Sequence, residues 1–553
     1  DAEEAAAERV RVMERLAADA AFFALDTTEM IAQGGWQKEA WERHLETVAR
    51  AAREQRIGKP LVLCVAPDME TEMLHRLVAP ALRLGVQGVM VTGGVEATVR
   101  QALADAIDCE TVQASEKQVE GERQTNQEPQ PQELRTSTRA RLIGLPTREA
   151  TLNTVREIRA RYGTDCPILA SGGVHEPQDA LELMAAGADL VLVDSGLVYS
   201  GPGLPKRINE AIEWQQERNE QREPLLLKKP EPTRNKPSTL RSSQAPTPRT
   251  FFQKSGWFWI QWLGLGMIVG GILAWLIAAT VVVLPYDVEF LRLGREGIAA
   301  INERLLYFMA HDRISLAGTM ISIGVLYFGL ARYAMRRGEQ WARTTVLASA
   351  AVGFASFFLY LGYGYFDPLH AAVALLLLPL FLLGLVKNNP RAPRPAPNLR
   401  NTAVWKRSLV GQLLFVSFGA GLLLSGLVIS GVGVTDVFVQ EDLNYLCTTS
   451  NSLQAANPNL VPLIAHDRAG FGGALVSDGI AYLLLSLWGF RQGEKWLWWT
   501  LLFGGFAGFF AVFSTHWYVG YLDQWHLAPA YLALLLYGAG LILTYPFLTR
   551  PRR

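Results

Sequence analysis

Histidine and aspartate recur together at fixed spacings in the second half of the chain. The sequence AHDR occurs at 310–313 and again at 465–468, and a D-x-x-H pattern occurs at 367–370 and again at 523–526. Imidazole nitrogens and carboxylate oxygens together suit Zn²⁺ or another divalent metal, two histidines can hold a haem, and such groups inside a membrane also exchange protons. The candidate ligands are His311, Asp312, Asp367, His370, His466, Asp467, Asp523 and His526.

Helix capping is the competing interpretation of the same aspartates. An aspartate directly before an apolar helix accepts hydrogen bonds from its free N–H groups, and Asp367-Pro368 has the order of an N-cap followed by proline at the first helical position. Capping accounts for the aspartates but leaves the accompanying histidines unexplained. Both interpretations therefore stay open.

These motifs belong to a longer internal repeat. At an offset of 155, RRGEQW at 336–341 returns as RQGEKW at 491–496, Asp287 matches Asp442 and Asn302 matches Asn457. The repeat predicts two tandem four-helix units with the same orientation. The RxGExW loops either recognise the soluble domain formed by residues 1–212 or form glycine turns with Arg–Glu pairing and an interfacial tryptophan.

The elements that carry the repeat are apolar. A helix needs about 20 residues to cross a bilayer, and eight stretches of suitable length follow residue 257. They lie at 257–284, 314–334, 344–363, 370–386, 408–432, 470–490, 495–515 and 527–548. We expect an all-α polytopic membrane domain, with the first repeat at 257–400 and the second at 401–553.

Positive charge predicts how this domain is oriented. Lysine and arginine gather in the connections 332–343 and 387–407, at 550–553, and in the Pro- and Ser-rich linker 213–256. The positive-inside rule places these segments, and residues 1–212 with them, on the cytoplasmic side of an inner or plasma membrane. The five histidines of the membrane half then lie at the outer surface, and the basic linker favours an anionic lipid bilayer.

Composition excludes several other classes of protein. The 553 residues carry 52 basic and 52 acidic side chains, so no basic excess points to nucleic acid as a partner. The four cysteines form no C-x-x-C spacing, which excludes a disulfide framework and a zinc site made of paired cysteines. No basic-then-apolar leader precedes the first helix, and we expect residues upstream of Asp1.

Residues 1–212 alternate short β-branched runs with amphipathic helical stretches, the pattern of a parallel sheet. Gly172-Gly173 and Ser195-Gly196 follow the last two expected strands. Glycines after strands seven and eight of a (β/α)8 barrel let backbone N–H groups approach a phosphate, so we expect a phosphate site there. The expected strands are 21–26, 61–66, 88–93, 166–171 and 189–195.

The segment ASGGVHEPQDALELMAAGADLVLVDSGLVYSGP at 170–202, together with PLVLCVAPD at 60–68 and LGVQGVMVTGG at 84–94, resembles the dihydroorotate dehydrogenase family. This resemblance implies an α/β TIM barrel that binds FMN and oxidises a small-molecule substrate. It places Gly172, Gly173, Ser195, Gly196 and Thr92 in the cofactor site. It also places Asp1 before the fourth strand, so we expect on the order of 100 upstream residues with three more strands.

The chain departs from the family pattern at catalytic positions. Cys64 stands where the resemblance implies a flavin-contacting lysine, Thr27 stands at the base, and Gly93-Gly94 replaces an Asn–Thr pair. The first functional hypothesis is a membrane-tethered FMN oxidoreductase that passes electrons to quinone. The alternatives are a catalytically degenerate barrel that regulates a metal, proton or solute transport or sensor domain, and an assembly anchor in a larger membrane complex.

Overall fold

The computed structural model describes residues 2–27, 38–54, 58–98, 139–226, 255–356, 364–385 and 396–550. The chain divides into two compact units, here called the α/β unit (residues 1–229 with 395–400) and the helical unit (residues 230–394 with 401–553). The expected linker begins inside a helix, because α10 spans Leu204–Leu226. The rest of that linker to residue 254, the polar run 110–138 and the end of the third expected span lie outside the described residues.

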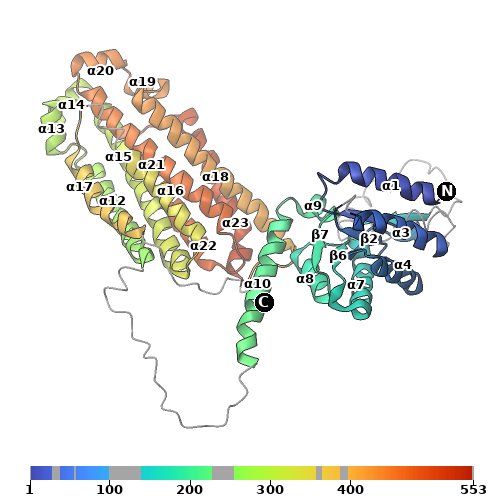
Figure 1. The fold of residues 1–553 in the computed structure, drawn as a ribbon. Coiled ribbons are helices and arrows are strands. Elements are labelled where there is room, and N and C mark those ends of the chain that lie inside the picture. The colour runs from blue at the N-terminus through green and yellow to red at the C-terminus, as the bar shows by residue number, and fades with distance from the viewer. Residues whose placement is uncertain are drawn as a thin grey trace, which may run out of the picture. The chain divides into compact units, whose positions relative to one another are not determined.

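The described part of the α/β unit contains one parallel sheet whose neighbours follow the chain in the order β1-β2-β3-β6-β7 (Figure 1). All five predicted strands are confirmed, each inside its expected range. This sequential order is that of successive βαβ units wound in one direction. Closure into an eight-stranded barrel stays a prediction. The strands are β1 Phe23–Asp26, β2 Leu61–Val65, β3 Gly88–Val91, β6 Ile168–Ser171 and β7 Leu190–Leu192.

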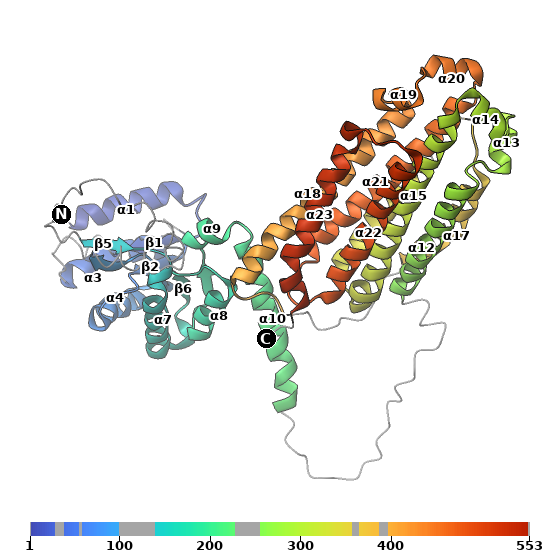
Figure 2. The same ribbon diagram turned by 180° about the vertical axis from the view of Figure 1, so that it is seen from behind.

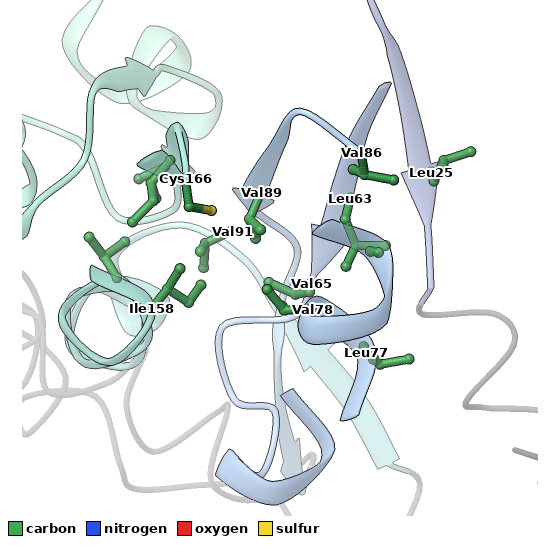
Figure 3. Packing of buried hydrophobic residues seen from close by; sticks show 14 of the residues in the cluster. Leu25, Leu63, Val65, Leu77, Val78, Val86, Val89, Val91, Ile158 and Cys166 are labelled. Atoms are coloured by element: carbon green, nitrogen blue, oxygen red, sulfur yellow. The ribbon is translucent and has the colours of Figure 1, made fainter. Parts of the chain in front are cut away.

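Alternation along the strands gives the sheet two different faces. Leu63, Val65 and Val89 turn to the helices, where they share one buried cluster with Val78 and Ile158 (Figure 3). The other face carries a row of paired positions across the sheet, formed by Asp26, Cys64, Met90, Leu169 and Leu190. The helices of this unit are α1 Ala2–Leu16, α3 Lys38–Arg53, α4 Thr71–Leu84, α7 Arg148–Tyr162, α8 Pro177–Ala186 and α9 Ser195–Ser200.

Two features of the α/β unit were not expected. An antiparallel pair, β4 Val95–Thr98 and β5 Arg139–Leu142, flanks the polar run. Residues 396–400 group with this unit, and the Gln178 N–H donates to the Leu399 carbonyl at 3.1 Å. The sequence placed 396–400 at the end of the first membrane repeat.

The helical unit contains a helix at each of the eight predicted apolar stretches (Figure 2). Six described helices are long and apolar enough to cross a membrane, whereas α16 and α17 have 17 residues each in the described part. The eight are α12 Gly256–Thr280, α15 Glu303–Gly329, α16 Gln340–Ser356, α17 Pro368–Gly384, α18 Ala403–Val434, α21 Leu460–Trp488, α22 Lys495–Val519 and α23 Gln524–Thr549.

Residues that are equivalent in the repeat, 155 positions apart in the sequence, make reciprocal contacts. Asn302 Nδ2 donates to the Leu446 carbonyl at 2.7 Å, and Asn457 Nδ2 donates to the Leu291 carbonyl at 2.8 Å. The bounds of the connecting short helices keep the same offset. These helices are α13 Pro285–Leu291, α14 Arg295–Ile301, α19 Gln440–Leu446 and α20 Ser450–Ala456.

Two ion pairs also join the RxGExW loops to each other. Arg337 Nη1 lies 3.0 Å from Glu494 Oε2, and Arg491 Nη1 lies 2.6 Å from Glu339 Oε1. Gly338 and the equivalent Gly493 both have positive φ, as the turn requires. The predicted glycine turn with Arg–Glu pairing is confirmed, and the pairs join one loop to the other.

Candidate functional sites

The two AHDR motifs lie inside α15 and α21, not before them. These helices begin at Glu303 and Leu460, upstream of the expected starts at 314 and 470. Asp312 and Asp467 are therefore buried within helices, and the capping interpretation is wrong for this pair. The helices continue through the motif because each buried carboxylate has a guanidinium partner.

The arginine of each AHDR motif binds the aspartate of the other AHDR motif. Arg313 Nε lies 2.7 Å from Asp467, and Arg468 Nε lies 3.4 Å from Asp312. Each arginine also binds a buried aspartate of a short helix, Asp287 for Arg313 at 2.8 Å and Asp442 for Arg468. The sequence repeat pairs Asp287 with Asp442 but does not indicate what either aspartate binds.

The aspartates of the D-x-x-H motifs behave differently. Asp367 caps α17 by accepting the His370 N–H at 2.9 Å, and Asp523 caps α23 by accepting the His526 N–H at 2.8 Å. The capping prediction is confirmed for this pair. Both motifs thereby fix their histidine in the first turn of a helix.

The histidines gather into clusters that mix the two repeats. Among the described residues, His311, His516 and His526 present ligand atoms within 4.8 Å of one another, as do Asp367, His370 and His466. In each cluster the AHDR histidine of one half of the repeat meets the D-x-x-H histidine of the other half, so neither cluster is made by one repeat alone. Asp312, Asp467 and Asp523 are outside these clusters.

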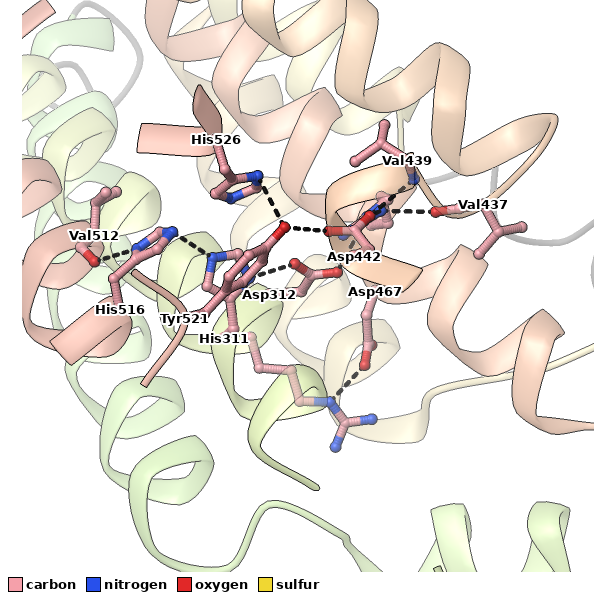
Figure 4. Close-up of polar contacts among 12 residues, drawn as sticks. His311, Asp312, Val437, Val439, Asp442, Asp467, Val512, His516, Tyr521 and His526 are labelled. Carbon is pink, nitrogen blue, oxygen red and sulfur yellow. Dashed lines mark hydrogen bonds and ion pairs between the residues drawn. The ribbon is translucent and has the colours of Figure 1, made fainter. Parts of the chain in front are cut away.

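His516 is the cluster member that the sequence did not single out. Its Nε2 lies 3.1 Å from His311 Nε2, and its ring centroid lies 5.3 Å from that of His526 (Figure 4). The repeat gives no signal for it. The two D-x-x-H motifs are 156 positions apart, and the residue 156 positions before His516 is Tyr360, which is not a histidine. Tyr360 lies outside the described residues.

In the α/β unit, Gly172 and Gly173 follow β6 with φ of +128° and +73°. A Cβ on Gly173 would lie 2.8 Å from the Arg148 Cα, and one on Gly172 would lie 2.7 Å from the hydroxyls of Thr147 and Thr151. Only glycine allows this loop to pack against the start of α7.

The second glycine loop packs directly on the first. A Cβ on Gly196 would lie 2.0 Å from the Val174 carbonyl oxygen, and Ser195 Oγ lies 3.0 Å from His175 Nε2. Burial lowers the pKa of His175 although Asp179 opposes this, so the imidazole is neutral near pH 7. The structure thus brings together the predicted residues Gly172, Gly173, Ser195 and Gly196.

These loops offer the donors that a phosphate needs. The short helix α9 begins at Ser195, and the N–H groups of a first helical turn have no partners within the helix. Ser195 and the neutral His175 together add one side-chain donor, because the hydrogen bond between them uses one of their two donor groups. The donor set fits a phosphate monoester, with one opposing feature, the carboxylate of Asp194 at the N-cap position.

Residues 96–215 match the family model described as dihydroorotate dehydrogenase. The α/β unit carries a dihydroorotate dehydrogenase family domain. Relatives described as dihydroorotate dehydrogenase (quinone) include one from Chloroflexus aurantiacus, 30% identical over 29% of this chain and 36% of the relative. Another, from Anaeromyxobacter sp. (strain K), is 28% identical over 39% of this chain and 53% of the relative.

The chain spans about a third to a half of the length of these curated relatives. Among solved structures, a dihydroorotate dehydrogenase from Eimeria tenella in complex with ferulenol is 19% identical. It matches 38% of this chain and 54% of its own length, with a TM-score of 0.27.

The family resemblance also assigns Thr27, Cys64 and Thr92 to positions of the flavin and substrate site. The Thr27 side chain is buried, and its hydroxyl donates to the Cys64 carbonyl at 2.8 Å, so it ties β1 to β2. Its role as a base stays a prediction, and the loop that follows it at 28–37 is outside the described residues. Burial, and then the carboxylate of Asp26, raise the pKa of Cys64 to about 12. Thr92 lies just after β3, and its N–H donates to the Val65 carbonyl at 3.0 Å.

Proposed function

We propose that the protein is a membrane-attached FMN oxidoreductase of the dihydroorotate dehydrogenase type that passes electrons from a small-molecule substrate to a quinone. The observation that carries this proposal is the family match over residues 96–215, which contains both glycine loops. The relatives described as quinone-linked and the six candidate membrane spans support quinone as the acceptor.

Backbone N–H groups near Gly172, Gly173, Ser195 and Gly196 would hold the FMN phosphate, and Thr92 would lie at the end of a neighbouring strand. When bound, FMN supplies a two-electron acceptor. The neutral thiol of Cys64 stands where the family resemblance implies a cationic lysine, so this chain offers no cation there to stabilise a reduced, anionic flavin. We therefore propose a small-molecule substrate without naming dihydroorotate.

The membrane arrangement is part of the same proposal. The helical unit would form two tandem four-helix repeats, α12, α15, α16 and α17 followed by α18, α21, α22 and α23. By the positive-inside rule, the basic connections support a cytoplasmic location of the α/β unit at the inner or plasma membrane. A quinone dissolved in that bilayer would then be within reach of a membrane-attached flavin domain.

The absorption spectrum of the purified chain in detergent tests the proposal. We expect the two visible-region bands of oxidised flavin, which bleach when a substrate or dithionite reduces it. Ser195→Asp should lose the flavin, because it adds a negative charge at the start of α9. Val198→Asp adds the same charge to the same helix at an exposed side chain and should retain it.

A second candidate function follows from the buried hydroxyl of Thr27 and the neutral Cys64. A barrel without catalytic groups would regulate a transport or sensor function of the helical unit, or would anchor an assembly. A purified, folded chain without flavin, which also fails to bind added FMN, would favour this second function and would exclude the first.

A further inference from the structure

We propose that His311, His516 and His526 form a binding site for a divalent transition-metal ion inside the helical unit. The site is independent of the proposed flavin chemistry in the α/β unit. It combines α15 of the first half with α22 and the first turn of α23 from the second half. Imidazole is a preferred ligand of Zn²⁺, Cu²⁺, Ni²⁺ and Fe²⁺.

The hydrogen bonds of the three rings fix which nitrogen is free. His311 Nδ1 lies 2.8 Å from the Asp312 carboxylate, and His516 Nδ1 lies 2.7 Å from the Val512 carbonyl. Both partners only accept hydrogen bonds, so each Nδ1 carries the proton and each Nε2 carries a lone pair in the neutral ring.

The Nε2 atom of His526 is also the free nitrogen, because its Nδ1 bonds to a tyrosine hydroxyl that bonds in turn to a carboxylate. The Tyr521 hydroxyl donates to the Asp442 carboxylate at 3.1 Å, so it accepts from His526 Nδ1, which lies 3.3 Å away. A hydrogen bond from the second ring nitrogen to a carboxylate, carbonyl or similar acceptor is typical of metal-binding histidines, because it orients the ring and raises its basicity.

The distance between two of the free nitrogens requires a cation. The Nε2 atoms of His311 and His516 face each other at 3.1 Å, and in the neutral tautomers neither carries a proton. Two nitrogens bound to one Zn²⁺ at about 2.0–2.1 Å in a tetrahedron lie roughly 3.3 Å apart. A haem iron between the same two rings would hold them about 4 Å apart, so the geometry favours a bare metal ion.

The surrounding charge also favours a cation. Asp312 and Asp442 bring two carboxylates to the site, whereas Arg468, which bonds to both, brings one positive charge. Arg468 is therefore neutralised by partners of its own and leaves one carboxylate charge in excess. This excess negative charge would offset part of the charge of a bound dication.

Three histidine ligands leave one coordination position open, which is typical of a metal ion that exchanges ligands or takes part in catalysis. A cavity of about 610 Å³ inside the helical unit is lined by all three histidines, and its walls include Phe418, Leu422 and Val428. Structural zinc sites have four protein ligands, whereas three protein ligands with an open fourth position are typical of catalytic sites. The fourth position here would face the cavity, where water or a small ligand can enter.

The experiment uses the purified full chain in detergent, stripped of metal with a chelator and titrated with Co²⁺ as a spectroscopic probe. We expect visible d–d bands of a cobalt–imidazole site and their displacement by Zn²⁺. His311→Ala and His526→Ala should each lose one equivalent of bound Co²⁺ relative to wild type, or bind it at least tenfold more weakly. His516→Gln should do the same while keeping an amide that can donate to Val512.

Asp478→Asn is the matched control. Asp478 lines the same cavity and accepts from Ser322 at 3.2 Å. Ser322 is 11 residues along α15 from His311, roughly 16 Å at the rise of an α-helix. This variant should bind Co²⁺ as the wild type does. X-ray absorption of the wild-type zinc form gives a measurement that needs no variant, and we expect at least three imidazole nitrogens at about 2.0–2.1 Å.

Two results would overturn the proposal. One is a wild-type chain that binds no Co²⁺ or Zn²⁺ above the level of the detergent blank. The other is a set of folded His311, His516 and His526 variants that bind as much metal as wild type, which would mean that only a proton bridges the two rings.

Discussion

Arg313 of α15 donates from Nε to the Asp467 carboxylate of α21 at 2.7 Å, and both side chains are mostly or fully buried. The two residues come from different AHDR motifs, and the Arg468–Asp312 pair repeats the contact in the opposite direction. The reciprocal ion pairs therefore join α15 to α21 in the interior of the helical unit.

Asp467→Ala should lower the free energy of unfolding of the helical unit by about 3–5 kcal/mol, because it removes one of the two carboxylates that bind the buried Arg313 guanidinium. Chemical unfolding in detergent measures this. The double variant Arg313→Ala/Asp467→Ala should be less destabilised than the sum of the single variants. Additive single effects would contradict the ion pair.

Close packing of α18 on α21 should depend on Gly419 and not on Gly421. A Cβ on Gly419 would lie 2.6 Å from the Leu483 backbone nitrogen, whereas one on Gly421 meets nothing within 4 Å. Gly419→Val should cost more than about 2 kcal/mol, because the helices must separate. Gly421→Val, on the same helix, should leave the melting temperature in detergent nearly unchanged. Equal effects would exclude the close approach.

Thiol labelling should separate the described cysteines by their burial. Cys447 is exposed, whereas Cys64 and Cys166 are buried. Burial is the first cause of a raised pKa for both buried thiols, which keeps them protonated and unreactive near pH 8. In a Cys109→Ala background, we expect one equivalent of maleimide to react with the folded chain and three after denaturation. Rapid labelling of Cys64 in the folded chain would contradict its place in β2.

Cys64 should also make the α/β unit less stable at alkaline pH. The folded pKa is raised from 9.0 to about 12, so the protonated thiol contributes fully below pH 9. The unfolded chain loses this proton first, and the contribution falls as the pH rises from 9 toward 12. The difference in unfolding free energy between wild type and Cys64→Ala should change over this window. A difference that stays constant from pH 9 to pH 12 would contradict the burial of the Cys64 thiol.

Removing the carboxylate of Asp194 should tighten FMN binding. Asp194 precedes the first turn of α9 and accepts no side-chain capping hydrogen bond, so its charge opposes a phosphate at the helix start. We expect Asp194→Asn to lower the dissociation constant for FMN about threefold to tenfold, measured by quenching of flavin fluorescence. Weaker binding by a folded variant would mean that the carboxylate supports the loop.

The amino-acid sequence by itself determined the five parallel strands, the eight apolar helices and the two glycine loops. Each of these depends on local patterns, such as the β-branched run around Leu63 or the glycines at 172 and 173, whose conformational requirements are set within a few residues. The caps at Asp367 and Asp523 are local in the same way, and the sequence placed both.

The tertiary structure alone decided the polar clusters inside the helical unit. Asp312 and Asp467 lie inside helices because arginines from distant segments neutralise them, and hydropathy cannot show that pairing. His516 joins His311 across 205 positions of sequence without a motif or an equivalent in the repeat to mark it. Which side chains meet inside the helical unit depends on how its helices pack, and that packing is fixed by contacts such as Gly419 against Leu483 rather than by spacing along the chain.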